Sequence, residues 1–126
     1  MTPFIAEWAR CQPWLAAALA RGGGTHTVDD VLNAVLAGRM QFWPGERSVL
    51  VTEIVTYPRL KAVRVFAGGG EANAALGEML ALERHVADFG RANGCQRIEG
   101  FGREGWARAL RRLGYADTRV FMWRAL

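Results

Sequence analysis

A run of three glycines is the first feature of this chain that could take part in chemistry. Gly68, Gly69 and Gly70 stand between a segment rich in β-branched residues and a segment with helical periodicity. Without a Cβ, their backbone allows positive φ and close approach of a ligand. Backbone N–H groups beside a helix N-terminus favour a phosphate. The run is therefore a candidate phosphate-binding turn; the alternative is a flexible turn whose helix terminus is satisfied by the carboxylate of Glu71.

The second candidate is an acid placed among apolar residues. In the segment 48–57, strand alternation puts Glu53 on the same face as Val49, Val51 and Val55. Desolvation on such a face predicts a raised pKa for the carboxyl, which suits a group that accepts a proton. The alternative interpretation is structural, because Arg64 on the next segment is placed to pair with Glu53.

The basic residues gather in the last third of the chain. Nine arginines and four acids lie from Arg84 onward, against seven basic and eight acidic residues before it. Trp106 lies among these arginines, and Trp and Arg dominate binding hot spots, so we expect a protein partner here. The candidate partner residues are Arg103, Trp106, Arg108, Arg111 and Arg112. A solvated arginine face is the alternative, and without a nucleic-acid signature we do not expect nucleic acid as the partner.

Metal chemistry has little support in the sequence. Cys11 and Cys95 are far apart and have no CxxC neighbour, and His26 and His85 show no HExxH arrangement. No apolar run approaches the length of a membrane span, and the first residues do not form a signal peptide. We expect two buried thiols and a protein that works in the cytoplasm.

Two helices are expected at the start of the chain, before Glu53. Pro3 suits a first helical position, Pro13 interrupts or restarts the helix, and the glycines at 22–24 stop it. A second helix begins after Thr27, with Asp30 at the capping-box position.

Strands and helices then alternate in a recognisable order. Residues 40–43, 48–57 and 60–67 predict an antiparallel meander, followed by a helix at 71–93, a strand at 96–101, a helix at 104–113 and a strand at 116–123. The predicted fold class is α/β (α+β), with one mixed sheet, helices on both faces and the order α-α-β-β-β-α-β-α-β in a single domain, 1–126.

This order resembles the GNAT acetyltransferase fold, and two short motifs support the likeness. Gly94 and Cys95 follow the long helix, with Ile98 entering the next strand, and the segment Leu113-Gly114-Tyr115 follows the later helix. Similar segments end the corresponding helices in GNAT proteins. The resemblance covers most of the chain and implies transfer of an acetyl group from acetyl-CoA to an amine.

The resemblance also implies roles for particular residues. GNAT enzymes hold the pyrophosphate of coenzyme A on a turn of pattern R/Q-x-x-G-x-G/A, although the segment 67–73 lacks the leading Arg or Gln and contains Glu71. The implied cofactor-binding residues are Val65, Phe66, Ala67, Gly68, Gly69, Gly70, Ala72 and Asn73. Glu53 would be the base, and Tyr115 would protonate the leaving thiolate. For Tyr115 the alternative is core packing by its ring.

A second resemblance is to small GNAT-like proteins of tailed phages. It rests on the segment Gly102-Arg103-Glu104-Gly105-Trp106 and on the later Leu110 and Gly114-Tyr115. It implies a phage or prophage protein, in the host cytoplasm or the virion. The alternative function is then a non-catalytic interaction module that contacts a virion or host protein.

Overall fold

The structure is a computed structural model and describes residues 3–101, 104–116 and 121–126. Its elements are α1 (Pro3–Arg21), α2 (Val28–Leu36), β1 (Met40–Pro44), β2 (Ser48–Thr56), β3 (Lys61–Gly70), α3 (Ala75–Ala92), β4 (Arg97–Gly100) and α4 (Glu104–Arg111). The predicted order of elements is confirmed as far as α4.

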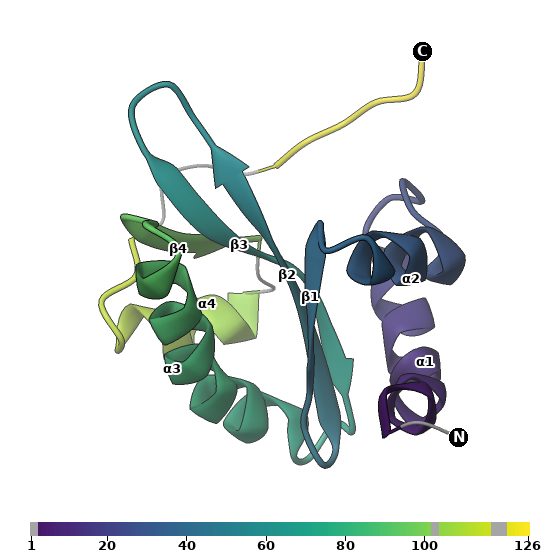
Figure 1. The fold of residues 1–126 in the computed structure, drawn as a ribbon. Helices are drawn as coiled ribbons and strands as arrows, with labels where there is room; N and C mark the ends of the chain where they lie inside the picture. The colour runs from purple at the N-terminus through teal and green to yellow at the C-terminus, as the bar shows by residue number, and fades with distance from the viewer. Residues whose placement is uncertain (1–2, 102–103, 117–120) are drawn as a thin grey trace.

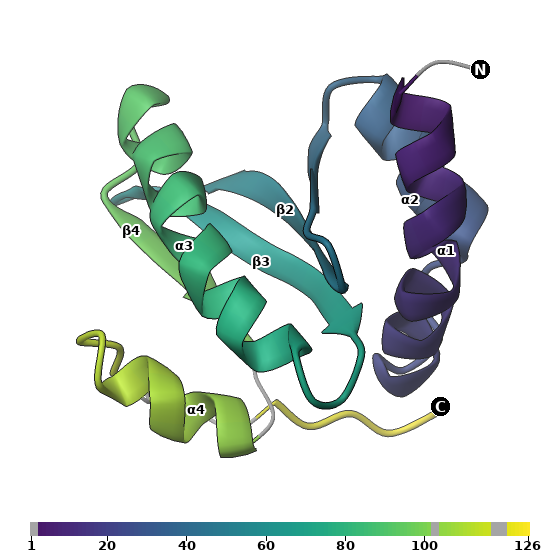
Figure 2. The ribbon, with the colours of Figure 1, turned by 90° about the horizontal axis from the view of Figure 1, so that it is seen from below.

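One mixed sheet carries the fold (Figure 1). Its strand order is β1-β2-β3-β4, with antiparallel pairing among the first three strands and parallel pairing of β3 with β4. Helices α1 and α2 cover one face, while α3 and α4 lie on the other (Figure 2). The predicted α+β class, with helices on both faces of a mixed sheet, is confirmed.

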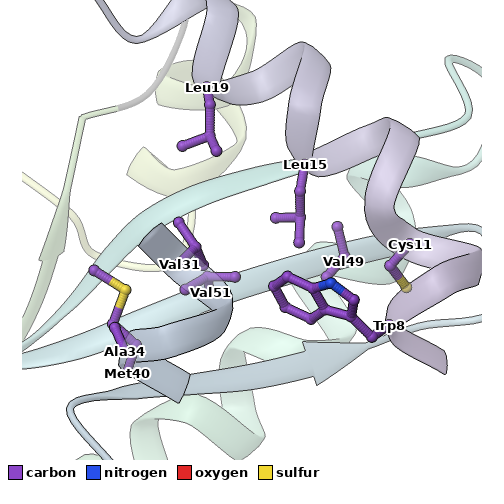
Figure 3. Packing of buried hydrophobic residues seen from close by; sticks show 9 residues of the cluster. All are labelled: Trp8, Cys11, Leu15, Leu19, Val31, Ala34, Met40, Val49 and Val51. Carbon is purple, nitrogen blue, oxygen red and sulfur yellow. The ribbon is translucent and has the colours of Figure 1, made fainter. Parts of the chain in front are cut away.

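Each face of the sheet has its own apolar core. On the α1/α2 face, Leu15, Val31, Val49 and Val51 are fully buried (Figure 3), because strand alternation turns every second residue of β2 toward these helices. On the α3/α4 face the buried residues are Leu50, Val63, Ala75, Met79 and Val86. The sheet is therefore fixed from both sides.

Helix α2 begins with the capping box that the sequence predicts. The Thr27 hydroxyl accepts a hydrogen bond from the amide of Asp30 at 3.1 Å, and the Asp30 carboxylate accepts one from the amide of Thr27 at 2.8 Å. Gly38, after the last turn, has a φ of +77°, which a residue with a Cβ rarely adopts.

The predicted interruption at Pro13 is wrong, because α1 continues through it. Pro13 is exposed and removes one helical hydrogen bond. Cys11, Leu15 and Leu19 are buried on the opposite side of the same helix, which holds the turns before and after the proline against the sheet.

The predicted glycine turn is also misplaced. β3 does not end at Ala67 but continues to Gly70, because Ser48 and Val49 at the start of β2 pair with Gly70 and Gly69. The turn instead comprises residues 71–74, and α3 begins at Ala75 rather than at Glu71.

The end of the chain differs from the expected last strand, 116–123. Residues 117–120 of that strand lie outside the described part, and residues 121–126 are in neither a helix nor a strand. No helix in the described ranges is both long and apolar enough to cross a membrane.

Candidate functional site

The most open part of the sheet is the far end of β3. β4 pairs with β3 only from Ala62 to Val65, and the pair of Val65 with Gly100 is the last. β3 then continues to Gly70 with β2 on one side alone, so its other edge has no strand partner among the described residues. Phe66 is an extra residue at the point where the β2–β3 register shifts, a β-bulge that bends the strand there.

A cavity of about 260 Å³ lies where β3 reaches α3. It is lined by Arg21, Gly69, Gly70, Ala72, Ala75, Leu76 and Trp106. Gly69, Gly70 and Ala72 are three of the eight residues that the sequence predicts for a cofactor. Arg21, in the last turn of α1, is the cation at this cavity, and it has no ion-pair partner in the described part of the chain.

The first turn of α3 opens beside this cavity without a side-chain cap. Its N-cap residue, Ala74, makes no such hydrogen bond, and the carboxylate of Glu71 lies 3.7 Å from Nε of Arg47. Glu78 accepts hydrogen bonds from the Arg47 amide at 2.9 Å and the Ser48 hydroxyl at 2.6 Å. The predicted capping of this helix by the Glu71 carboxylate is therefore wrong, and the acid in the first turn of the helix is Glu78.

Packing requires the three glycines, whatever they bind. A Cβ at Gly68 would lie 2.8 Å from Leu50 Cδ2, and one at Gly69 would lie 2.9 Å from the Trp14 carbonyl oxygen. At Gly70 the distance to the Arg47 carbonyl oxygen would be 2.4 Å. The glycine run alone is therefore no sign of a cofactor.

The remaining predicted cofactor residues are divided between the faces. Val65 packs with the α3-side core, whereas Phe66 and Ala67 pack against the α1/α2-side core. The Phe66 ring lies 4.6 Å from that of His26, edge to face. Asn73 is exposed in the turn before α3 and does not line the cavity.

Glu53 lies in a separate, wider groove on the α1/α2 side. The groove has a volume of about 940 Å³ and is lined by Thr25, His26, Asp30, Asn33, Ala34, Gly38, Arg39, Met40, Gln41, Glu53 and Ile54. The Glu53 carboxylate is 3.4 Å from the guanidinium of Arg64, directly across the β2–β3 pairing. The predicted ion pair of Glu53 with Arg64 is thus present, and the role of Glu53 as a base stays a prediction.

Sequence reasoning missed a second acid beside Glu53. Glu99 on β4 accepts hydrogen bonds from the Tyr57 hydroxyl at 2.5 Å, from Arg64 at 3.2 Å and from Arg97 at 3.1 Å. Burial acts to raise the pKa of the Glu99 carboxyl, but these three donors outweigh it and hold the pKa below its usual range. The sequence carries no signal for this contact, because it arises from the parallel register that places Glu99 directly opposite Arg64.

Replacing Glu99 with glutamine is expected to make folding less sensitive to acid. Since the folded state lowers the Glu99 pKa, its contribution is complete above the unfolded value of about 4.3 and disappears as pH falls through the folded pKa. The stability difference between wild type and Glu99→Gln should therefore be largest at pH 7 and shrink toward pH 3, as measured by urea unfolding.

Tyr57→Phe provides the comparison for this prediction. It removes one donor but keeps the carboxylate and both arginines of the cluster. Its unfolding free energy should still fall with acid more steeply than that of Glu99→Gln. Equal pH slopes for wild type and Glu99→Gln would contradict the prediction.

Tyr115 is not brought to Glu53. It lies just after α4, half-buried, and interacts with Glu83 on α3. Burial raises the pKa of the Tyr115 phenol, and the Glu83 carboxylate adds to the rise. Glu53 faces the groove on the α1/α2 side, and Tyr115 lines neither this groove nor the cavity beside α3.

The predicted partner residues also separate. Trp106 is half-buried and packs with the α3-side core, and its role at a partner surface stays a prediction. Arg108, Arg111 and Arg112 are exposed, and Arg103 lies outside the described residues. Among the residues described, no cluster of three or more His, Cys, Asp or Glu side chains could hold a metal ion.

Comparison with known proteins identifies structural neighbours only. No protein-family model and no curated protein matches the chain. The tetramutant of the BH1408 protein from Bacillus halodurans superposes with a TM-score of 0.65 at 18% identity, covering 97% of this chain and 94% of that one. A transcriptional regulator from Bacillus halodurans C-125 superposes with a TM-score of 0.64 at 16% identity, covering 100% of this chain and 96% of that one. Wild-type TTHA1254 from Thermus thermophilus superposes with a TM-score of 0.63 at 18% identity, covering 96% of this chain and 92% of that one. This chain therefore shares the fold of these proteins over almost its whole length.

Proposed function

We propose that this chain is a GNAT-like acyltransferase that binds acetyl-CoA along the open edge of β3 and transfers its acetyl group to an amine. The observation that carries the proposal is the parting of β3 from β4 after Val65 and Gly100. The open strand edge leads to a cavity with an arginine and an uncapped helix start.

The residues at this edge fit the chemistry of coenzyme A. An open strand edge offers backbone N–H and C=O groups to a ligand that contains amides. Arg21 and the amides at the start of α3 offer positive charge to a diphosphate. Glu71 lies near Arg47, and neither it nor Glu78, the acid in the first turn of α3, lines the cavity.

The groove on the α1/α2 side suits the acceptor amine. Acetyl-CoA supplies a thioester, and the protein must remove a proton from the attacking amine. Glu53 is the carboxylate at this groove nearest β3, and Arg64 fixes its orientation. Asp30 adds a second carboxylate to the groove wall, which also carries one arginine, Arg39, and a carboxylate can hold a cationic amine before it loses its proton.

Reversing the charge at Arg21 is expected to weaken acetyl-CoA binding. A charge-assisted contact contributes about 1.5–3 kcal/mol, so Arg21→Glu should raise the Kd by roughly 10- to 100-fold or more. Isothermal titration calorimetry measures this change. Ala72→Asp adds an acid to the cavity lining without the backbone clash expected at Gly69, and should act in the same direction.

Arg59→Glu is the matched control, because it makes the same charge change at an exposed position in the β2–β3 connection. It should leave the Kd within about twofold, as expected for a screened charge outside the site. Failure of the wild type to bind at millimolar acetyl-CoA would overturn the proposed function. If binding holds, Glu53→Gln should reduce acetyl transfer while leaving the Kd for acetyl-CoA unchanged.

The alternative is a non-catalytic module that binds another protein, in a phage or its host. The observation that favours it is the exposed set of Arg108, Arg111 and Arg112 on and after α4. Such a module would retain partner binding in Arg21→Glu and lose it when these three arginines are replaced together.

A further inference from the structure

The groove on the α1/α2 side carries a cation as well as its carboxylates. Among the described residues that line it, Arg39 is the only arginine or lysine, and the acids are Asp30 and Glu53. A groove for a simple amine gains nothing from an arginine, because two cations repel each other. Arg39 therefore indicates a ligand that has an anionic group in addition to its amine.

The end of α2 fixes the backbone at Arg39. Gly38 has a φ of +77°, and its amide donates a hydrogen bond to the Val35 carbonyl at 3.1 Å. The Arg39 amide donates one to the Ala34 carbonyl at 2.9 Å. These are the two hydrogen bonds of a Schellman motif, which ends a helix on a glycine. β1 begins at the next residue, so this arginine is held where the helix meets the sheet (Figure 1).

Arg39 lies close to the carboxylate that we propose as the base. Met40, the next residue, pairs with Glu53 across β1 and β2, and paired Cα atoms of antiparallel strands are about 5 Å apart. The Glu53 carboxylate is paired with Arg64. No ion pair joins Arg39 to Glu53 or to another residue in the ranges that the structure describes. Arg39 and Glu53 both line the groove, so one small ligand can reach both.

We propose that the acceptor is a free α-amino acid, whose carboxylate binds Arg39 while its amine lies at Glu53. An α-amino acid carries both groups on one carbon, which suits a cation and a carboxylate placed this near to each other. The planar guanidinium can hold a carboxylate by two parallel hydrogen bonds. The groove volume of about 940 Å³ lies within the range of small-molecule sites.

This inference rests on the proposed function, because the amine is the group that would be acetylated. In the transfer, the neutral amine forms a C–N bond to the acetyl carbon and the C–S bond of the thioester breaks. Glu53 takes the proton that the amine gives up, and the thiolate of coenzyme A takes a proton from water. Arg39 takes no part in these steps and acts by binding the carboxylate.

Heteronuclear NMR titrations test the groove without relying on transfer. The probes are the standard L-α-amino acids and their α-amides, added with and without millimolar coenzyme A. At least one amino acid should shift the amide signals of Gly38 and Arg39. Its Kd should be at least about 10-fold below that of its α-amide, which lacks the charge that Arg39 binds. The α-amide also represents the first residue of a peptide, so equal affinity for both probes would overturn the proposal.

Arg39→Met keeps the length of the side chain and removes its charge. It should raise the Kd for the preferred amino acid at least about 10-fold and leave that for the α-amide within about twofold. Arg59→Met is the matched control, since Arg59 is exposed in the β2–β3 connection and does not line the groove. It should change neither Kd. Equal losses for both probes in Arg39→Met, or a wild type that binds none of the amino acids, would contradict the proposal.

Calorimetry with acetyl-CoA separates this inference from the proposed function. A wild type that binds acetyl-CoA but no amino acid would overturn the inference alone. One that binds an amino acid but not acetyl-CoA would overturn the proposed function, and with it the acceptor role, while the amino-acid site stands. Where both bind, the release of free coenzyme A should show a KM for the amino acid raised at least about 10-fold in Arg39→Met, with kcat little changed.

Discussion

Replacing Gly70 with alanine is expected to lower the free energy of unfolding by about 3 kcal/mol, the upper end for overpacking. The new Cβ would lie 2.4 Å from the Arg47 carbonyl oxygen and 2.7 Å from Ser48 Cα. Both are backbone atoms, so no side chain can rotate away. Relief would require breaking the pairing of Ser48 with Gly70, or the 2.9 Å hydrogen bond from the Glu71 amide to Arg47.

Gly77→Ala makes the same chemical change where there is space. No atom lies within 4 Å of the added Cβ, and the residue is helical, so this variant should gain about 0.5–1 kcal/mol. Urea unfolding of both variants at neutral pH gives the comparison. A Gly70→Ala protein as stable as wild type would show that the end of β3 yields easily and that the glycine there is not required by packing.

The contrast between the two glycines also shows what local sequence predicts. A glycine beside a helix start signals a turn, and residues 68–70 accordingly predicted one. The decisive contact is long-range, since Ser48, more than twenty residues earlier, pairs with Gly70 and extends the strand. Periodicity describes each segment by itself and carries no information on this pairing.

Elements whose signals are local were predicted well. The box of Thr27 and Asp30 fixed the start of α2, and the alternation of Val49, Val51 and Glu53 placed these residues on one face. The prediction at Pro13 was wrong, because the free-energy cost of a proline in a helix is smaller than the gain from burying the apolar residues around it in α1.

The candidate site was predictable only where its residues lie on strands that follow one another in the chain. Glu53 and Arg64 belong to adjacent strands of a predicted meander, and their pairing follows from that order. Glu99 reaches the same cluster only through the parallel pairing of β4 with β3. The register of this pair depends on how α3, the helix that connects the two strands, packs on the sheet. Arg21 reaches the cavity beside α3 through the packing of α1 across β3, which no sequence motif indicates.

Replacing Leu15 with alanine is expected to destabilise the fold by about 3–4 kcal/mol, within the range for buried leucines. Leu15 is fully buried where α1 lies on Val49 and Val51 of β2, as Figure 3 shows. The removed atoms leave a cavity between helix and sheet that the surrounding residues fill only in part. Urea unfolding measures the loss, and Leu36→Ala, at a position 67% exposed, should change the free energy by less than about 0.5 kcal/mol.

The Leu15→Ala protein also separates stability from donor binding. Arg21 is six residues further along α1, after the buried Leu19, so the last turn of the helix keeps its own anchor. Under the proposed function, acetyl-CoA at 100 times the wild-type Kd should stabilise wild type and variant alike by about 2.7 kcal/mol, because an unchanged Kd gives the same gain in both. A ligand-induced gain lost in Leu15→Ala would mean that the whole of α1, rather than its last turn, shapes the cavity proposed for acetyl-CoA.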